Sequence, residues 1–148
     1  MAPPNTLPLF SSVPDIKAVS PSAANTSSQG GGTIGTDIFL AFTAGANGAR
    51  IFRAYWVPTA STPTATTATQ GRVFASTQAS GVTTKSNTHL LREVALPSVN
   101  ADHATTPAQQ VETLADINLG PNQSLLCTNH AAPAANTEWK LIVEYANF

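Results

Sequence analysis

Short runs in which apolar residues occupy every second position dominate the chain after residue 33. The clearest run covers residues 137–145, where Trp139, Leu141, Val143 and Tyr145 occupy alternate positions. Successive side chains of a β-strand point to opposite faces, so this period of two predicts a half-buried strand. We therefore expect a strand near the end of the chain, with these four side chains on one face. The other face would carry Glu138, Lys140, Ile142 and Glu144.

A second pair of strands is predicted around a turn signal in the first third of the chain. Residues 36–44 and 49–57 are rich in large apolar and β-branched side chains, and Asn47-Gly48 stands between them. Asn-Gly tolerates the positive φ angles of tight hairpin turns, so the two runs are expected to pair antiparallel to each other. Pro58 is expected to end the second run, because proline cannot donate a hydrogen bond to a ladder.

The two faces of the run 49–57 differ in character. Phe52 and Trp56 lie on one face with Ala54, and this face is the better candidate for the core. The other face carries Ile51, Arg53, Tyr55 and Val57. Arg53 and Tyr55 are therefore expected to meet solvent, a sheet edge or a partner. Arginine and aromatic residues are also the usual anchors of protein interfaces.

The remaining runs are less regular. We expect a loop or an irregular edge strand from residue 58 to 70, a strand at 71–77 and a turn followed by a strand at 120–129. Residues 88–99 partly fit a helical stripe, but Pro97 and the surrounding β pattern favour a strand with a bulge. Residues 106–119 could be a strand or a short helical turn, and the spacing by three of Val111, Leu114 and Ile117 favours the helical turn locally.

These elements together predict an all-β fold. Seven or eight short strands with turn residues between them are typical of an antiparallel β-sandwich, either jelly-roll-like or immunoglobulin-like. The chain has one cysteine, Cys127, and so lacks the Cys-Trp-Cys spacing of true immunoglobulin domains. We therefore expect a jelly-roll-like sandwich over residues 34–148.

Residues 1–33 differ from the rest. Five prolines and the Gly-rich stretch before Thr33 predict an extended N-terminal arm followed by a flexible linker. The arm also carries apolar side chains that either pack back on their own domain or dock on a neighbouring subunit. The candidate interface residues of the whole chain are Leu7, Leu9, Phe10, Val13, Ile16, Arg53 and Tyr55.

Composition narrows the classes of partner. The 148 residues fit one domain, only 10% of them are charged and the net charge is −1. Such a chain has no general attraction for nucleic acid or for an anionic membrane surface. It contains no apolar run of about 18 residues, and the first ten residues lack the basic start of a signal peptide. No nucleic acid, membrane or cofactor is therefore expected as a partner.

The residues that could carry chemistry do not form a recognisable motif. Gly30–Gly35 reads G-x-G-x-x-G, but it follows a polar stretch and precedes a strand, whereas a dinucleotide fingerprint opens a helix. Cys127 and His130 have zinc-ligand spacing without a second cysteine, and Asp102-His103 fits a solvated loop. The eight carboxylates are scattered rather than paired across a cleft. We expect a protein that is not an enzyme, with no catalytic residue and no metal site.

Four stretches of the sequence are similar to those of a known group of proteins. These are GANGARIFRAYWVPT, TQGRVFAST, NTHLLREVALPSV and LLCTNHAAPAANTEWKLIVEYANF. Over roughly residues 45–148 they resemble the small β-sandwich proteins encoded among the structural genes of tailed bacteriophages, which share an Ala/Thr-rich β domain and a last strand of the W-x-x-x-V kind. The resemblance defines no binding motif, so no functional residue is carried over from it.

The resemblance implies a place in the virion. The first expectation is a capsid decoration (cement) protein on the outer capsid surface, a homodimer or homotrimer that bridges subunits of the major capsid protein. The alternative is a receptor- or carbohydrate-binding module associated with a tail or fibre. In that case Tyr55, Trp56, Trp139 and Tyr145 would be the candidate contacts for a sugar, although the core is the expected place of both tryptophans.

Overall fold

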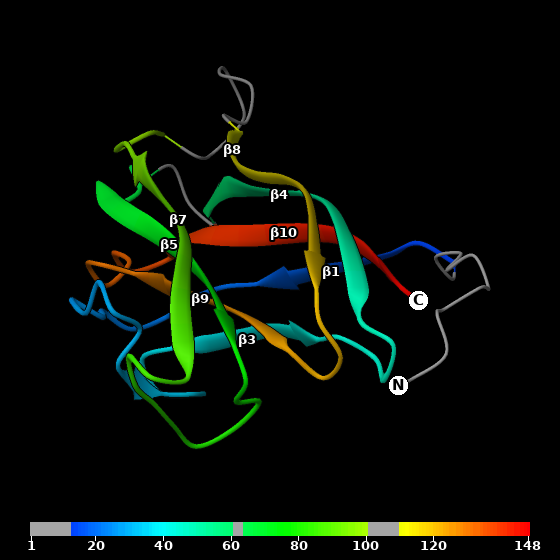
Figure 1. Ribbon diagram of the computed structural model, residues 1–148. Helices are drawn as coiled ribbons and strands as arrows, with labels where there is room; N and C mark the ends of the chain where they lie inside the picture. Colours follow the sequence, from blue (N-terminus) through cyan, green and yellow to red (C-terminus); the bar gives the residue numbers. More distant parts are fainter. Residues whose placement is uncertain (1–12, 61–63, 101–109) are drawn as a thin grey trace, which may run out of the picture.

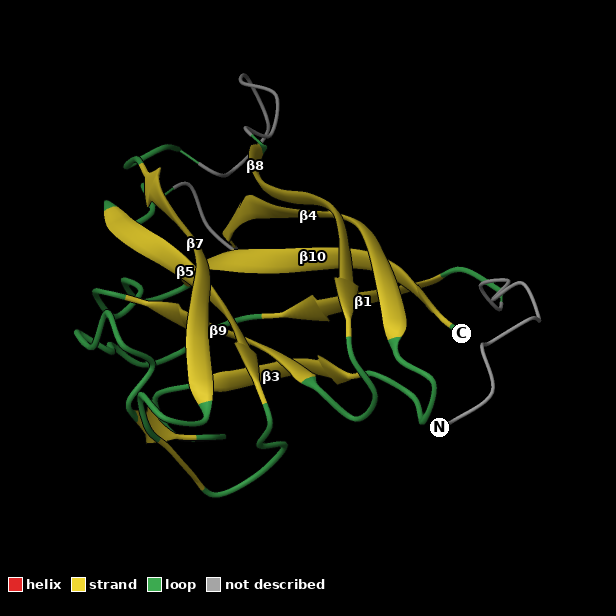
Figure 2. Ribbon diagram, in the orientation of Figure 1, coloured by secondary structure: helices red, strands yellow, loops and turns green. Residues whose placement is uncertain are grey.

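The protein is all-β in the computed structural model, which describes residues 13–60, 64–100 and 110–148 (Figures 1 and 2). One sheet, the first sheet, has the order β1 (Asp15–Val19), β10 (Thr137–Asn147), β4 (Ala49–Ala60) and β8 (Val111–Leu119). The second sheet has the order β3 (Phe39–Thr43), β9 (Ser124–Asn129), β5 (Thr69–Ser76) and β7 (Thr88–Leu96). A two-stranded ribbon joins β2 (Gly32–Thr33) to β6 (Val82–Thr83), and every named pair of strands is antiparallel.

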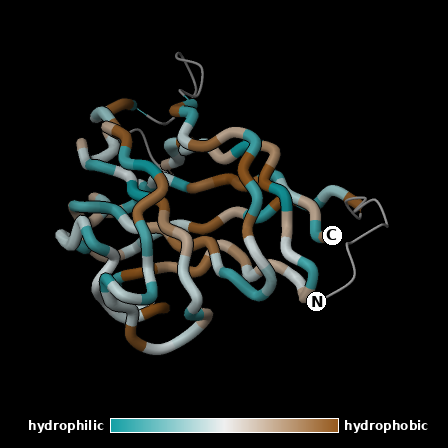
Figure 3. Tube along the Cα trace, viewed as in Figure 1, coloured by the Kyte–Doolittle hydropathy of each residue, from teal (hydrophilic) through white to brown (hydrophobic). Residues whose placement is uncertain are grey.

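The two large sheets share one hydrophobic core, which makes the fold sandwich-like. The first sheet contributes Trp56, Trp139 and Leu141 to it, and the second contributes Val73 and Leu125. All five side chains are at most 2% exposed. Figure 3 shows hydrophobic stretches along the central strands and hydrophilic residues in the connecting loops. The expected alternation of β10 is confirmed, because the four side chains that were expected to share one face are all buried.

A bulge in β4 corrects the predicted faces of that strand. Arg53 pairs with Glu144 and Ile51 pairs with Tyr145, so Phe52 is the extra residue between two consecutive pairs. An extra residue reverses the inward and outward alternation beyond it. Ile51 is therefore fully buried and Phe52 is only half-buried, in contrast to the prediction. The prediction was right for the buried Ala54 and Trp56, and for Arg53 and Tyr55 on the other face.

Two further expectations for this region were wrong. Asn47 and Gly48 do form a turn, with Gly48 at a φ of 96° and its N–H 3.0 Å from the carbonyl of Gly45. However, the strands on either side belong to different sheets, so the turn carries the chain across the sandwich instead of closing a hairpin. Pro58 also does not end β4, because it is paired with Trp139 of β10. On the other side of β4, the pairing with β8 stops before Pro58, at Trp56.

β8 (Val111–Leu119) is a strand, so the helical turn favoured by the spacing of its apolar residues is wrong. Thr113 is an extra residue between consecutive pairs with β4, and Asp116 has a φ of 53°. These irregularities shift the alternation of β8 and leave Val111, Leu114 and Ile117 half-buried against the core. A strand with two distortions thus imitates the spacing of a helix. By contrast, the bulged strand expected at 88–99 is confirmed, with Leu91 as the unpaired residue of β7.

Residues 15–33 are paired with, or packed on, both large sheets. β1 adds an edge strand to the first sheet, and Ala24 bridges Asn129 at the second. The Asn25 side chain donates to the carbonyl of Gly31 (3.1 Å) and to Asp37 (3.0 Å). Arg72, which is 4% exposed, donates to the carbonyl of Asn25 at 3.1 Å and to Glu93. This stretch is therefore held more firmly than the flexible linker that its composition suggests.

A second, smaller cluster of buried side chains lies outside the main core. Ile38, Phe74 and Leu126 are each 0% exposed, and Ile34 packs against them. Phe74 and Leu126 belong to neighbouring strands of the second sheet, on the side away from the main core. The outer face of the second sheet is thus partly covered by the chain itself, whereas the outer face of the first sheet carries the residues considered next.

Candidate interaction surface

The outer face of the first sheet brings together residues from all four of its strands. Directly opposed residues of antiparallel strands point to the same side. Glu144 of β10 is opposite Ile16 of β1 and Arg53 of β4, and its neighbour Ile142 is opposite Ala18 and Tyr55. We call this surface the A face. Its members are Ile16, Ala18, Arg50, Phe52, Arg53, Tyr55, Glu112, Asp116, Ile142 and Glu144.

Arg53 stands in the centre of the A face and is held in place by two neighbours. Its Nε donates to Oε2 of Glu144 at 2.8 Å and its Nη2 donates to Oε1 at 2.7 Å. The guanidinium carbon lies 4.7 Å from the centre of the Tyr55 ring. The Tyr55 hydroxyl donates to the same Glu144 carboxylate at 3.3 Å. A bidentate ion pair and a stacked ring thus fix one orientation of the arginine.

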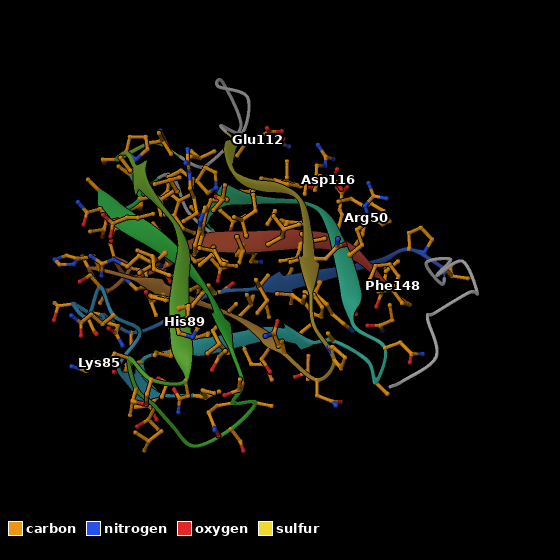
Figure 4. All side chains as sticks on the ribbon, in the orientation of Figure 1. Arg50, Lys85, His89, Glu112, Asp116 and Phe148 are labelled. Carbon is orange, nitrogen blue, oxygen red and sulfur yellow. The ribbon has the colours of Figure 1, made fainter. Side chains whose placement is uncertain are left out.

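A second arginine repeats this arrangement toward the end of the sheet. Arg50 donates to Oδ1 of Asp116 from Nε (2.8 Å) and forms an ion pair from Nη2 (2.7 Å). Its guanidinium carbon lies 5.8 Å from the centre of the Phe52 ring. Figure 4 shows Arg50 and Asp116 side by side at the outer border of β4 and β8, with Glu112 at the far end of β8. The bulge at Phe52 and the left-handed conformation of Asp116 create this pairing.

The ion pairs shift the ionisation of their members. Hydrogen bonding to Arg53 lowers the pKa of Glu144, and the same contact raises the pKa of Arg53. Both groups are therefore charged throughout the neutral range. Because Arg53 is exposed and Glu144 is partly exposed, solvent screens their attraction, which contributes little to folding stability. The ion pairs instead hold the arginine side chains in one orientation. Side chains that are already fixed lose less conformational entropy on binding.

The structure places the predicted interface residues as follows. Arg53 and Tyr55 are in contact on the A face, and Ile16, which is 62% exposed, lies on the same face. Val13 is 85% exposed and precedes β1. Leu7, Leu9 and Phe10 lie outside the described residues.

The sequence reasoning missed the partners of these residues. Glu144 was recognisable as an outward position of β10, but nothing in the sequence indicated that β10 pairs with β4. Arg50, Phe52 and Asp116 could not be found from an alternating pattern, since the irregularities of β4 and β8 place them on the A face.

The aromatic residues considered for sugar binding are mostly in the core. Trp56 is 0% exposed, Trp139 is 2% exposed and Tyr145 is 6% exposed, and Tyr145 stacks on Phe42 with ring centres 4.0 Å apart. A sugar stacks on the open face of a ring, which these three side chains cannot offer. Of the four aromatic candidates only Tyr55 remains partly exposed.

The other chemical candidates are also occupied by structural roles. Burial raises the pKa of the Cys127 thiol far above its usual range, so this side chain is an inert member of the core. His130 is exposed, and its Nδ1 lies 3.2 Å from Nη2 of Arg72. Gly32 and Thr33 of the glycine motif form β2. Asp102 and His103 lie outside the described residues, and the described ranges contain no cluster of three metal-ligating side chains.

A shallow polar cavity of about 410 Å³ lies where β4 ends and β10 begins. Its charged groups are Glu138 and Lys140, which form an ion pair at 2.8 Å, and Thr59 donates to Glu138 at 2.9 Å. Burial alone would raise the pKa of Glu138, but hydrogen bonds from Lys140, Ser20 and Thr59 outweigh it and lower the pKa. The polar groups of this cavity satisfy one another, so the A face is the stronger candidate for a partner.

Comparison with known proteins does not identify this surface. No protein-family model matches the chain, and no curated protein matches it significantly. Within the residues that the structure describes, no helix is long and apolar enough to span a membrane. The functional argument therefore depends on the surface itself.

Proposed function

We propose that this chain is a structural protein of a bacteriophage virion, a capsid decoration protein that binds the outer shell and bridges subunits of the major capsid protein. The observation that carries the proposal is the A face. It spans four strands, it presents two arginines, a tyrosine and a phenylalanine, and its arginines are already fixed by ion pairs. Arginine and aromatic residues are enriched in protein interfaces, and Tyr and Arg are frequent hot spots.

We further propose that the sandwich is a jelly roll. Its eight longer strands form two four-stranded sheets with the orders β1-β10-β4-β8 and β3-β9-β5-β7. Apart from the hairpin of β5 and β7, neighbouring strands in these orders are separated in sequence by other long strands, as the nested Greek keys of a jelly roll require. Jelly rolls are common in viral capsid proteins and in lectins. A fold does not determine a function, so this order supports the proposal without carrying it.

The proposed mechanism is clamping. Each copy would bury the A face against the shell at the junction of neighbouring subunits. A single standard-size contact buries about 1,600 Å² in total and gives an affinity that depends on a few anchor residues. Copies joined as a homodimer or homotrimer would gain further by avidity, because the second contact is intramolecular. Many such clamps would resist the outward pressure of packaged DNA.

Residues 1–12 are proposed to add reach to this clamp. Leu7, Leu9 and Phe10 would dock on a neighbouring subunit, and the prolines around them reduce the entropy lost on docking. Removal of residues 1–12 is then expected to weaken shell binding while the urea midpoint of the remaining chain is unchanged. Equal binding by the shortened chain would remove the arm from the mechanism.

The direct experiment is a binding titration with shells that lack this protein. Purified chain is mixed with expanded shells, the shells are pelleted and the bound chain is quantified. The proposal expects saturation at a fixed simple ratio to the major capsid protein and a higher melting temperature of the decorated shell. Failure to saturate, or saturation without any gain in shell stability, would contradict it. The alternative as a carbohydrate-binding module gains no support from the buried tryptophans.

A further inference from the structure

The cations on the outer face of the first sheet already have carboxylate partners within the same chain. Lys140 and Glu138 belong to this face, because the outward positions of β10 continue through them from Ile142. Among the residues that the structure describes, an acidic partner would therefore find no unpaired cation on this face. The three ion pairs are Arg50–Asp116, Arg53–Glu144 and Lys140–Glu138.

Glu112 is the exception among the carboxylates. It is exposed on β8 and directly opposite Tyr55 of β4, which places it on the A face. Every other carboxylate side chain in the described part of the chain accepts a hydrogen bond, whereas Glu112 has neither a hydrogen bond nor an ion pair there. The hydrogen bond to Glu144 is the main reason that the pKa of Arg53 is raised, and the charge of Glu112 adds to this effect through space.

The outer face of the first sheet thus carries one carboxylate more than it carries cations. A partner that covers this face removes water from Glu112. A charge that loses its hydration without gaining a partner opposes binding, and a like charge facing it opposes binding further. A basic side chain opposite Glu112 would remove both costs. The charges of this face are therefore complementary to a basic partner surface and not to an acidic one.

We propose that the partner of the A face places a basic side chain, lysine or arginine, opposite Glu112. This inference rests on the proposed function, in which the partner is a subunit of the shell. Glu112 lies at the far end of the edge strand β8, away from Arg50 and Asp116 (Figure 4). A charge pair at such a border acts chiefly on the rate of association and on its dependence on salt. Glu112 would therefore select and steer the partner, whereas Arg53 anchors it at the centre.

A series of charge variants of the full chain tests this inference in the shell-binding titration. Glu112→Gln removes the charge, and Glu112→Lys reverses it. Ser80→Lys is the matched control for Glu112→Gln, because it changes the net charge by the same amount at an exposed position between β5 and β6. Each variant is titrated at about 0.05 M and about 0.5 M salt, which differ several-fold in the range of electrostatic attraction. Urea unfolding of each variant checks that the fold is intact.

At low salt we expect Glu112→Gln to weaken binding about threefold, as for an exposed ion pair, and Glu112→Lys to weaken it about tenfold or more. Both losses should shrink at high salt, and Ser80→Lys should bind like the wild type. Wild-type binding by both Glu112 variants would overturn the inference, and so would tighter binding by Glu112→Lys, which an acidic partner would produce. In either case the proposed function would stand. Failure of the wild type to saturate the shells would instead overturn the proposed function, and this inference with it.

Discussion

Arg53 and Glu144 meet across β4 and β10 in a two-bond ion pair, with 2.8 Å between Nε and Oε2 and 2.7 Å between Nη2 and Oε1. The pair is exposed to solvent, and Tyr55 contacts both of its members. Exposed pairs add little to folding, so the order of this pair matters here chiefly for the proposed contact with a shell. In the account given above, it is the preformed centre of the surface that binds the shell.

Arg53→Ala separates binding from folding. We expect shell binding to weaken by about tenfold or more, as for an interface hot spot, with no change in the urea midpoint. Folding stability should not change because Arg53 is exposed. Binding should weaken because the substitution also removes the contacts that hold Tyr55 and Glu144 in place. The binding titration and urea unfolding measure the two effects. Arg92→Ala is the matched control, since Arg92 is an exposed arginine on β7 of the other sheet. Equal binding by both variants would remove the A face from the mechanism.

The pH dependence of shell binding follows from Glu144. The hydrogen bond from Arg53 lowers the pKa of Glu144 from 4.5. Above pH 4.5 the carboxylate is therefore ionised, and the ion pair holds both side chains in one orientation. That order is lost as the pH falls through the lowered pKa, because the carboxyl group is then neutral. Binding of the wild type is expected to weaken below about pH 4.5. Glu144→Gln should bind weakly at neutral pH and show a flatter profile, and a wild-type profile in this variant would refute the role of the pair.

Gly71→Ala tests how tightly the two sheets pack. A Cβ atom at this position would lie 2.7 Å from Cε2 of Trp56 and 2.8 Å from Cδ1 of Leu96. Both neighbours are fully buried or nearly so, and overpacking of this kind destabilises a core by about 1–3 kcal/mol. Urea unfolding should report that loss. Gly31→Ala is the control, because its nearest neighbour would be Oγ of Ser27 at 3.4 Å. Equal midpoints for both variants would contradict the packing described.

Arg72→Met tests what holds residues 21–33 on the second sheet. The substitution leaves the carbonyl of Asn25 without its buried donor and Glu93 without its ion pair. Loss of hydrogen bonds from a charged donor is expected to destabilise the protein by about 2–3 kcal/mol. Amide hydrogen exchange should also become faster at Asn25 and Gly31. Unchanged exchange at these positions would show that Arg72 does not anchor the segment.

The regular parts of the fold were predictable from alternation alone. β10 alternates from Thr137 to Tyr145, and its prediction is confirmed because one face meets the core over most of its length. The bulged strand β7 was also recognisable. Both cases depend on local pattern, which a sequence displays directly.

The irregular parts were not predictable, and they are the parts that form the A face. The extra residue at Phe52 and the left-handed Asp116 follow from how β4 fits β8 and β10, which is a property of three strands distant in sequence. Likewise, the Asn47-Gly48 turn was visible, but its local signal does not reveal whether the next strand stays in the same sheet. Arg53 and Tyr55 were identified by residue type, and their partner Glu144 required the pairing of β10 with β4.

The most direct test of the proposed function is the copy number of this chain in purified virus particles. Quantitative mass spectrometry would compare its peptides with those of the major capsid protein. A decoration protein is predicted to be present at a ratio near one, or at a simple fraction such as about one third for a trimer at shared positions. A handful of copies per particle would place the chain at a tail or vertex, and its absence from the particles would contradict a structural role in the virion.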